Sequence, residues 1–263
     1  MIAAHRRTLI LEYLRKHGAA SIPELADAVG ASRSSARRDL DFLADSGTIL
    51  RSRGGAIVDD SHRTTFEPPR RLGAKTSVEQ KVAIARKAVE LLKPSQSVIF
   101  DSSSTVFEVA RLAVERDLRL TACTNDLDIA RLLGGAANLR VIVLGGTIRP
   151  DSMTLAGEPG FGFLDRLHVD VALIGIHSLA GGRLSETTIE VSDMKRRMIA
   201  SAARVIVLAD SSKFAHPAFC DVCGLDRVGA VVSDAALSDA AQASLREAGV
   251  ELILADQSAT PKA

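Results

Sequence analysis

Residues 32–58 read SRSSARRDLDFLADSGTILRSRGGAIV, and this stretch decides the interpretation of the N-terminal part of the chain. Ser32 is a residue type that caps helices, and the apolar residues that follow it recur at helical spacing over residues 33–46. The predicted inner face consists of Ala36, Leu40 and Leu43. Gly47 ends the helix, and two short β-type runs then flank the basic Gly54-Gly55 turn. The stretch therefore predicts a helix followed by a β-hairpin.

Two more helices are predicted before this stretch. Apolar residues recur along one side of residues 3–17, and Gly18 ends that segment as a left-handed cap. The run Ser21-Ile22-Pro23-Glu24 has the spacing of a capping box and opens a short second helix that Gly30 stops. Two short helices joined by a Gly-containing turn, the second bearing Arg37-Arg38, form a helix-turn-helix, and a hairpin behind one is a wing.

The residue types of this unit suit DNA. The positive N-terminal end of the third helix can approach phosphates and base edges in a major groove. Arg37 and Arg38 point about 100° apart along the helix, so only one can read bases and the other contacts the backbone. The alternative is a solvated basic helix pair in another small domain. The predicted DNA-contacting residues are Ser32, Arg33, Ser34, Ser35, Arg37, Arg38, Arg51, Arg53, Gly54 and Gly55.

Composition limits the classes of protein to consider. The chain has 263 residues, 46% apolar and 25% charged, which is an ordinary globular composition. Its net charge of +1 excludes a uniformly basic coat protein, but residues 1–77 carry 13 Lys and Arg against 9 Asp and Glu. No apolar run approaches the roughly 18 residues that span a bilayer, and no secretory signal is visible. Three cysteines are too few for a disulfide scaffold, so we expect a cytoplasmic protein.

Metal or redox chemistry has one candidate motif. Cys220-x-x-Cys223 has the spacing of half a zinc site or of a redox pair, or holds two small buried thiols. There is no second CxxC motif, and His216 is the only other nearby ligand type. We therefore predict no metal and no cofactor.

Beyond residue 58 the chain changes character. Residues 59–77 contain two prolines and little apolar periodicity, which is typical of a linker. Strands then alternate with helices, which predicts an α/β domain with a mostly parallel, doubly wound sheet. The predicted strands cover residues 98–100, 118–123, 141–144, 171–174, 205–208, 230–232 and, at an edge, 251–254; the predicted helices cover 80–92, 106–115, 128–133 and 192–202. The predicted domains are thus 1–58, the linker 59–77, the α/β domain 78–256 and a tail 257–263.

Polar residues collect where these strands end. Such sheets bind ligands beyond the carboxyl ends of their strands, and the amides and hydroxyls at a helix N-terminus can hold a phosphate. The alternative is that Ser and Asp here are ordinary capping residues. Four such loops, one with a lysine, favour a small anionic ligand. The candidates are Asp101, Ser102, Ser103, Ser104, Thr105, Thr124, Asn125, Gly145, Gly146 and Lys213, together with His177 and Glu186 farther along.

Residues Ser32 to Leu40, Gly47 and Arg51-x-x-Gly54-Gly55-Ala56 resemble the DeoR/GlpR family of bacterial repressors, and the resemblance covers about residues 3–255. That family usually has Thr and a β-branched residue where Ser35 and Ala36 stand. The second half resembles the family's sensor domain, which is similar in fold to ribose-5-phosphate isomerase and glucosamine-6-phosphate deaminase. The matching positions include Gln80-Lys81, Asp101 to Thr105, Thr124-Asn125, Gly145-Gly146, Gly157, Asp170, Gly175, Gly181-Gly182, Lys195 and Asp210-x-Ser212-Lys213.

The resemblance implies a repressor of carbohydrate-metabolism genes that a phosphorylated sugar or related metabolite releases from double-stranded operator DNA. One winged helix offers little contact area, so we expect a homo-oligomer. Ile176 and His177 stand where the isomerases place a catalytic aspartate, and the enediol mechanism needs a carboxylate base, so we predict no enzyme.

Two alternatives to this function stay open. His177 is a polar lining residue or a base, and Glu186, in a Gly-rich loop, and Glu190 are substitute carboxylates. A sugar-phosphate isomerase with an appended DNA-binding module would use one of them. A nucleoid-type protein without ligand is the third possibility, and the four-loop site argues against it.

Overall fold

The computed structural model describes residues 2–45, 49–52, 54–58, 64–65, 77–150 and 152–256. The chain divides into two compact units, Met1–Thr76 and Ser77–Ala263, which are described separately. Almost all of the predicted linker, the predicted tail, Gly47 and the wing residue Arg53 lie outside the described residues.

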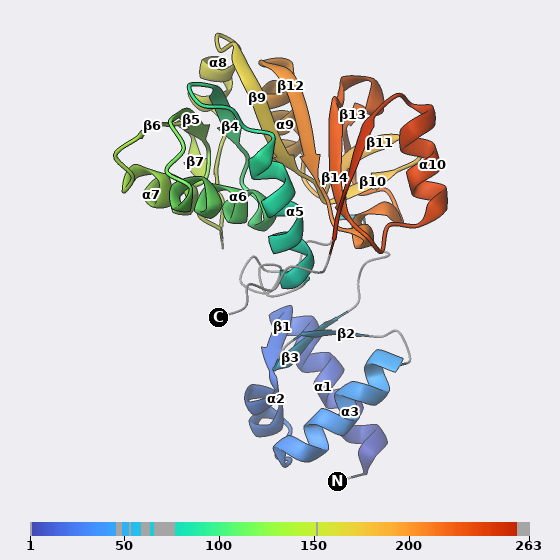
Figure 1. Ribbon diagram of the computed structural model, residues 1–263. Helices are drawn as coiled ribbons and strands as arrows, with labels where there is room; N and C mark the ends of the chain where they lie inside the picture. Colours follow the sequence, from blue (N-terminus) through green and yellow to red (C-terminus); the bar gives the residue numbers. More distant parts are fainter. Residues whose placement is uncertain are drawn as a thin grey trace. The chain divides into compact units, whose positions relative to one another are not determined.

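The described part of unit 1 contains three helices and a small sheet (Figure 1). The helices are α1 (Ala3–His17), α2 (Ile22–Ala28) and α3 (Arg33–Asp45), and the antiparallel strands are β1 (Ala19–Ser21), β3 (Gly55–Val58) and β2 (Ile49–Ser52) in that order. Gly18 follows α1 with a φ of 74°, and Ser21 and Glu24 form the predicted capping box, so both signals are confirmed. Strand β1 was not predicted, because three residues are too few to show an alternating pattern.

The core of unit 1 explains why these elements pack as they do. Ala36 and Leu40 are fully buried and Leu43 almost so, which confirms the predicted inner face of α3. Packing is tight where β1 and β3 pair: a Cβ on Gly55 would lie 2.2 Å from the carbonyl oxygen of Ala20. Only glycine fits there, because no Cβ can approach backbone so closely.

Unit 2 is built on a seven-stranded sheet in the order β15-β14-β12-β9-β4-β5-β6, and every neighbouring pair is parallel. The predicted parallel α/β sheet with residues 251–254 at an edge is therefore confirmed. Its strands are β4 (Ser97–Phe100), β5 (Leu120–Thr124), β6 (Leu139–Val143), β9 (Val169–Gly175), β12 (Ala202–Leu208), β14 (Ala230–Asp234) and β15 (Glu251–Ala255).

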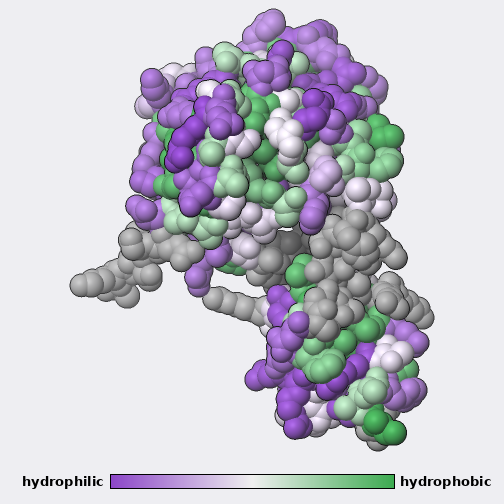
Figure 2. All heavy atoms as spheres, turned by 90° about the vertical axis from the view of Figure 1, so that its right-hand side faces the viewer, coloured by the Kyte–Doolittle hydropathy of each residue, from purple (hydrophilic) through white to green (hydrophobic). Residues whose placement is uncertain are grey.

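Helices cover both faces of this sheet (Figure 1). They are α5 (Val78–Glu90), α6 (Ser104–Glu115), α7 (Leu127–Gly134), α8 (Gly160–Leu164), α9 (Ile189–Ala200) and α10 (Asp239–Glu247). One apolar core joins α5, α6 and α7 to one face of the sheet, and a second joins α8, α9 and α10 to the other. On the face in Figure 2, hydrophilic side chains cover much of the surface of this unit, with apolar ones between them.

Two small antiparallel sheets were not predicted. Strands β7 (Thr147–Ile148) and β8 (Leu155–Ala156) form one, and β10 (Ser178–Ala180), β11 (Arg183–Glu186) and β13 (Cys220–Gly224) form the other. The prediction that Glu186 lies in a Gly-rich loop was wrong: Gly181 and Gly182 make the turn between β10 and β11, and Glu186 ends β11. Helix α9 ends at Ala200, before the predicted Ala202, because β12 starts there.

The chain path creates a switch point in the large sheet. From β4 the chain adds β5 and β6 on one side, and it then returns to add β9, β12, β14 and β15 on the other. The connections that leave β4 and β9 therefore run to opposite sides, and in parallel sheets of this kind the crevice beyond the carboxyl ends of two such strands is where ligands bind. Among the helices described here, none is both long enough and apolar enough to cross a membrane.

Candidate DNA-binding surface and ligand site

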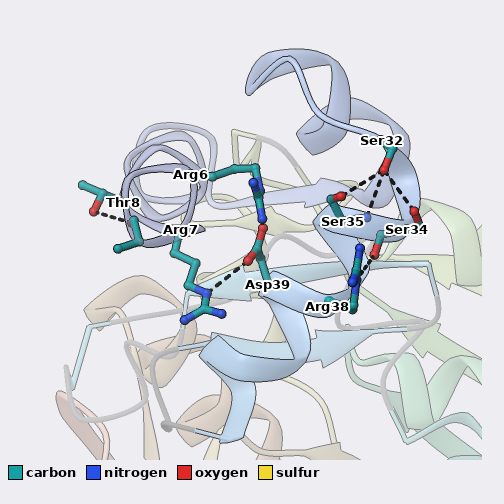
Figure 3. A network of polar contacts seen from close by, with 9 residues as sticks. Arg6, Arg7, Thr8, Ser32, Ser34, Ser35, Arg38 and Asp39 are labelled. Atoms are coloured by element: carbon teal, nitrogen blue, oxygen red, sulfur yellow. Dashed lines mark hydrogen bonds and ion pairs between the residues drawn. The ribbon is translucent and has the colours of Figure 1, made fainter. Parts of the chain in front are cut away.

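The start of α3 gathers the predicted DNA-contacting residues. The Ser32 hydroxyl accepts a hydrogen bond from the Ser35 N–H at 3.2 Å and also contacts the Ser34 hydroxyl (Figure 3). The Arg38 Nε donates to the Ser34 carbonyl at 3.4 Å. Ser35 is partly buried, and the exposed residues of this surface are Ser32, Arg33, Ser34, Arg37 and Arg38. Hydroxyl and guanidinium donors therefore lie along the outer side of α3 from its first residue.

The wing is joined to α3 by an ion pair. The Arg51 Nη2 lies 3.2 Å from the Asp41 Oδ1, and the Arg51 side chain is partly buried. Gly54 is exposed with a φ of 93°, whereas Gly55 is buried against β1. Of the predicted wing contacts, Gly54 therefore lies on the surface, Arg51 bridges to α3, and Gly55 is required for strand packing.

The switch point of unit 2 holds Asp101 and the N-terminus of α6. Asp101 directly follows β4, is 1% exposed, and accepts a hydrogen bond from the Gly175 N–H at 3.0 Å. Ser103 caps α6 by accepting from the Val106 N–H at 3.1 Å, and Ser102, Ser103 and Ser104 are all partly exposed. Thr105 is buried in the first turn. The first amides of α6 thus open beside the carboxyl ends of β4 and β9.

A buried lysine, which was not among the predicted site residues, organises this crevice. Lys195 of α9 is 4% exposed, donates to the Gly175 carbonyl at 2.6 Å, and lies 3.3 Å from the Asp101 Oδ2. It also pairs with Glu186, whose Oε1 accepts from the His177 N–H at 3.0 Å. Burial alone would lower the pKa of Lys195, but Asp101 and Glu186 together raise it. The lysine therefore stays charged and joins α9, β9, β11 and the loop after β4.

The two carboxylates around Lys195 leave one acceptor unsatisfied. Burial raises the pKa of Asp101, although Lys195 opposes that change. No donor from the described part of the chain reaches the buried Asp101 Oδ1, nor the buried Oδ1 of Asn125. These residues follow the neighbouring strands β4 and β5, about 4.8 Å apart. Within the described residues, two acceptors without donors therefore follow adjacent strands at the carboxyl edge of the sheet.

The remaining predicted ligand residues on this edge have structural contacts. The buried Thr124 hydroxyl accepts from the Asp126 N–H at 3.1 Å, and the Asn125 amide donates to the Leu155 carbonyl at 3.0 Å. A Cβ on Gly145 would lie 2.8 Å from the Pro159 ring, and one on Gly146 would lie 2.6 Å from the Ala156 carbonyl oxygen. The two glycines are thus explained by close packing against the segment that leads into α8.

Lys213 lies on the other side of β9, after β12. It belongs to the short turn η1 (Ser211–Phe214), which Asp210 caps by accepting from the Ser212 N–H at 3.1 Å. The fully buried Asp234, at the end of β14, accepts from the Ser211 N–H at 2.7 Å. Two carboxylates therefore hold this turn, and Lys213 is partly exposed on it.

A second cation lies near Lys213. Lys81, in the first turn of α5, is 8% exposed. Burial lowers its pKa to about 8, Asp210 opposes this decrease, and the positive charge of Lys213 adds to it. In the sequence, Lys81 stands out only as a position that matches the family, because a lysine near the start of a helix is usually on the surface. Its burial shows only in the folded chain.

His177, Glu190 and the cysteines complete the set of predicted residues. His177 is partly exposed just after β9, beside Glu186, whereas Glu190 is exposed on the first turn of α9. Burial raises the pKa of the Cys223 thiol to about 11, and Cys220 accepts a long contact from Arg196 at 3.6 Å. Within the described residues, no group of three or more His, Cys, Asp or Glu is arranged to hold a metal ion.

Comparison with known proteins matches both units. Residues 6–62 match the DeoR-like helix-turn-helix domain, and residues 76–235 match the DeoR C terminal sensor domain. The chain is 31% identical over 252 residues to a putative aga operon transcriptional repressor of Escherichia coli O157:H7, covering 95% of this chain and 93% of that protein. It is 30% identical over 236 residues to the glycerol-3-phosphate regulon repressor of Escherichia coli K12, covering 89% and 92%.

Among solved structures, ribose 5-phosphate isomerase A of Methanocaldococcus jannaschii is similar over 51% of this chain and 53% of that chain, with 18% identity and a TM-score of 0.38. The two family models together span most of the chain, and the relatives match along almost their full length. The chain therefore belongs to the DeoR family of DNA-binding transcriptional regulators.

Proposed function

We propose that this protein is a repressor of carbohydrate-metabolism genes, and that a phosphorylated sugar or polyol controls its binding to operator DNA. Its relatives include a glycerol-3-phosphate regulon repressor and a putative aga operon repressor. The observation that carries the ligand proposal is the pair of cations, Lys81 and Lys213, at the same sheet edge as the open N-terminus of α6. Helix amides and lysines are the groups that hold phosphate.

The rest of the crevice suits the carbon chain of such a ligand. Asp101 and Asn125 offer buried oxygen acceptors that no donor of the described residues reaches, and sugar hydroxyls are donors of the right kind. From β12, which precedes Lys213, to β4, which precedes Asp101, the sheet edge spans two strand spacings, or roughly 10 Å. A small phosphorylated polyol can extend over that span, with its phosphate at the lysines and its hydroxyls at Asp101.

The DNA proposal rests on α3 and the wing. Ser32, Arg33, Ser34, Ser35, Arg37 and Arg38 would contact the operator from α3, with Arg51, Arg53 and Gly54 in the wing, where the buried Gly55 supports the strand pairing. Two winged helices related by a two-fold axis would bind two half-sites, so we infer a homo-oligomer. An operator target also implies a cytoplasmic protein. The alternative of an isomerase with a DNA-binding module has no support from the relatives named here, which are repressors.

Calorimetry on the full chain tests the ligand proposal. Phosphorylated sugars and polyols are titrated beside their unphosphorylated counterparts, and at least one phosphorylated compound is expected to bind while its counterpart does not. Lys213→Ala removes a charge that contacts phosphate and should weaken that binding, whereas Lys93→Ala, at an exposed lysine of the same unit, should leave it unchanged. Equal affinity in wild type and Lys213→Ala would show that the phosphate assignment is wrong.

A further inference from the structure

The inner side of α3 carries a buried charge. Asp39 is 1% exposed, although its neighbours on that side of the helix are apolar. Two arginines of α1 neutralise it: the Arg6 Nε donates to the Asp39 Oδ2, and the Arg7 Nε donates to the Oδ1 at 3.0 Å (Figure 3). A buried carboxylate that loses such partners is strongly unfavourable. The three side chains therefore fix the N-terminal turn of α1 against the middle of α3.

Arg7 has a second contact, which leads toward the DNA-facing side. Its guanidinium carbon lies 3.5 Å from the centre of the Phe42 ring, and Phe42 is 51% exposed. Phe42 follows Arg38 by four residues, so both side chains lie on the same side of α3. The Arg7 side chain keeps 27% of its surface exposed. Although it comes from α1, Arg7 thus belongs to the surface that Arg38 occupies.

We propose that Arg7, positioned by Asp39 and Phe42, contacts a DNA backbone phosphate and extends the operator surface from α3 and the wing to α1. This inference rests on the proposed placement of DNA against α3. A guanidinium has five N–H donors in a rigid fork, so one edge can bind the carboxylate while the other binds a phosphate. Arg6 and Arg7 both face the carboxylate of Asp39, and the Arg7 side chain stays partly exposed, which suits an anionic partner. The stacking on Phe42 fixes the plane of the fork before DNA arrives.

A purely structural Arg7 would give a different result in one measurement. Neutralising one phosphate contributes about −0.9 to the slope of log K against log salt concentration. A phosphate contact therefore affects the slope, and it affects binding to all sequences alike. An arginine that only stabilises the fold would change thermal stability and leave the slope unchanged.

The test uses the full chain, the tightest duplex selected from a random library, and a scrambled duplex, titrated from 50 to 200 mM salt. Arg7→Ala should weaken binding to both duplexes by a similar factor and reduce the slope by about 0.9 for each binding domain on the DNA. Arg7→Lys keeps the charge and should restore most of the slope. It also serves as the readout if Arg7→Ala does not fold. Arg246→Ala, at an arginine in unit 2, is the control and should match the wild type.

Arg38→Ala separates the two proposals. If Arg38→Ala lowers affinity and slope while Arg7→Ala leaves both unchanged, this inference is wrong and the α3 interface stands. If neither variant affects binding, the α3 interface itself is wrong. Loss of thermal stability in Arg7→Ala with an unchanged slope would also contradict the inference, because Arg7 would then be only structural.

Discussion

Burial and neighbouring charges determine the charge of two lysines in unit 2, Lys195 and Lys81. Lys195 is held charged by two carboxylates, whereas Lys81 has a pKa lowered to about 8 by burial. Because the pKa of Lys81 is about 8, the affinity for an anion should depend on pH around that value. A phosphate monoester has a second pKa of about 6 and is therefore already a dianion in this range. The ligand's charge is therefore constant while that of the protein changes.

The pH dependence of ligand affinity follows from the sign of this shift. Lys81 is charged below its pKa and neutral above it, so the affinity for a phosphorylated ligand should fall as the pH rises from 7 to 9. Lys81→Met should bind more weakly at pH 7 and show a flatter profile, and Lys93→Ala should retain the wild-type profile. Calorimetry at several pH values measures this. A wild-type affinity independent of pH over this range would contradict the role of Lys81.

Gly175 is the residue whose size matters most at the switch point. A Cβ there would lie 2.3 Å from both the Cβ and the Oγ of Ser103, the residue that caps α6. Gly175→Ala should therefore destabilise the protein by about 1–3 kcal/mol in urea unfolding and weaken ligand binding, because the loop before α6 must move. Ser103→Gly in the same chain removes the clash and should recover part of the loss.

A matched glycine is available as the control. A Cβ on Gly134, at the end of α7, would meet nothing within 4 Å, so Gly134→Ala should be neutral or stabilise by up to about 1 kcal/mol. If Gly175→Ala is as stable as Gly134→Ala and binds ligand normally, the close approach of β9 to the α6 loop does not shape the site.

At the scale of elements, most of the fold was predictable from the sequence. Helices with strong caps, such as α2 after Ser21, and apolar strands such as β9 have local signals. The sheet of β10, β11 and β13 has strands of three to five residues with mixed burial, so its pairing depends on the rest of the fold. The burial of Lys195 could not be predicted for the same reason. A lysine within a helix is usually exposed, and the burial of this lysine depends on where β11 places Glu186.

Lys195 joins four elements, and its removal should be costly. Lys195→Met leaves Asp101 and Glu186 buried without a cation, which is expected to lower the free energy of unfolding by about 3–5 kcal/mol. The pKa of Asp101 is already raised by burial, and without Lys195 it rises further. Such a group favours the folded state at low pH and loses that contribution as the pH rises. The deficit should therefore be larger at pH 8 than at pH 5.

Urea unfolding of Lys195→Met and of the triple variant Asp101→Asn, Glu186→Gln, Lys195→Met measures this at both pH values. The triple variant, which buries no charge in the cluster, should regain much of the lost stability. A Lys195→Met protein within about 1 kcal/mol of the wild type would show that the cluster does not hold these elements together.

For the whole molecule, the central claim is that ligand binding in one unit changes DNA binding in the other. This requires that the ligand bind with different affinity to the DNA-competent and the released states, and such coupling is typically about 1–3 kcal/mol, or 5- to 150-fold. The sequence predicted both units, whereas the class of the ligand stays a prediction. It could not predict the coupling, because coupling is a difference between two states of the whole chain.

The most direct test is the anisotropy of a labelled duplex, selected from a random library by the full chain, during titration with phosphorylated sugars and polyols and their unphosphorylated counterparts. We predict that at least one phosphorylated compound weakens duplex binding within the 5- to 150-fold range of typical coupling, and that its counterpart has no effect. Lys213→Ala should bind the duplex like the wild type and need more of the compound for release. If no phosphorylated compound alters duplex binding, or if the counterparts release the duplex equally well, the account is contradicted.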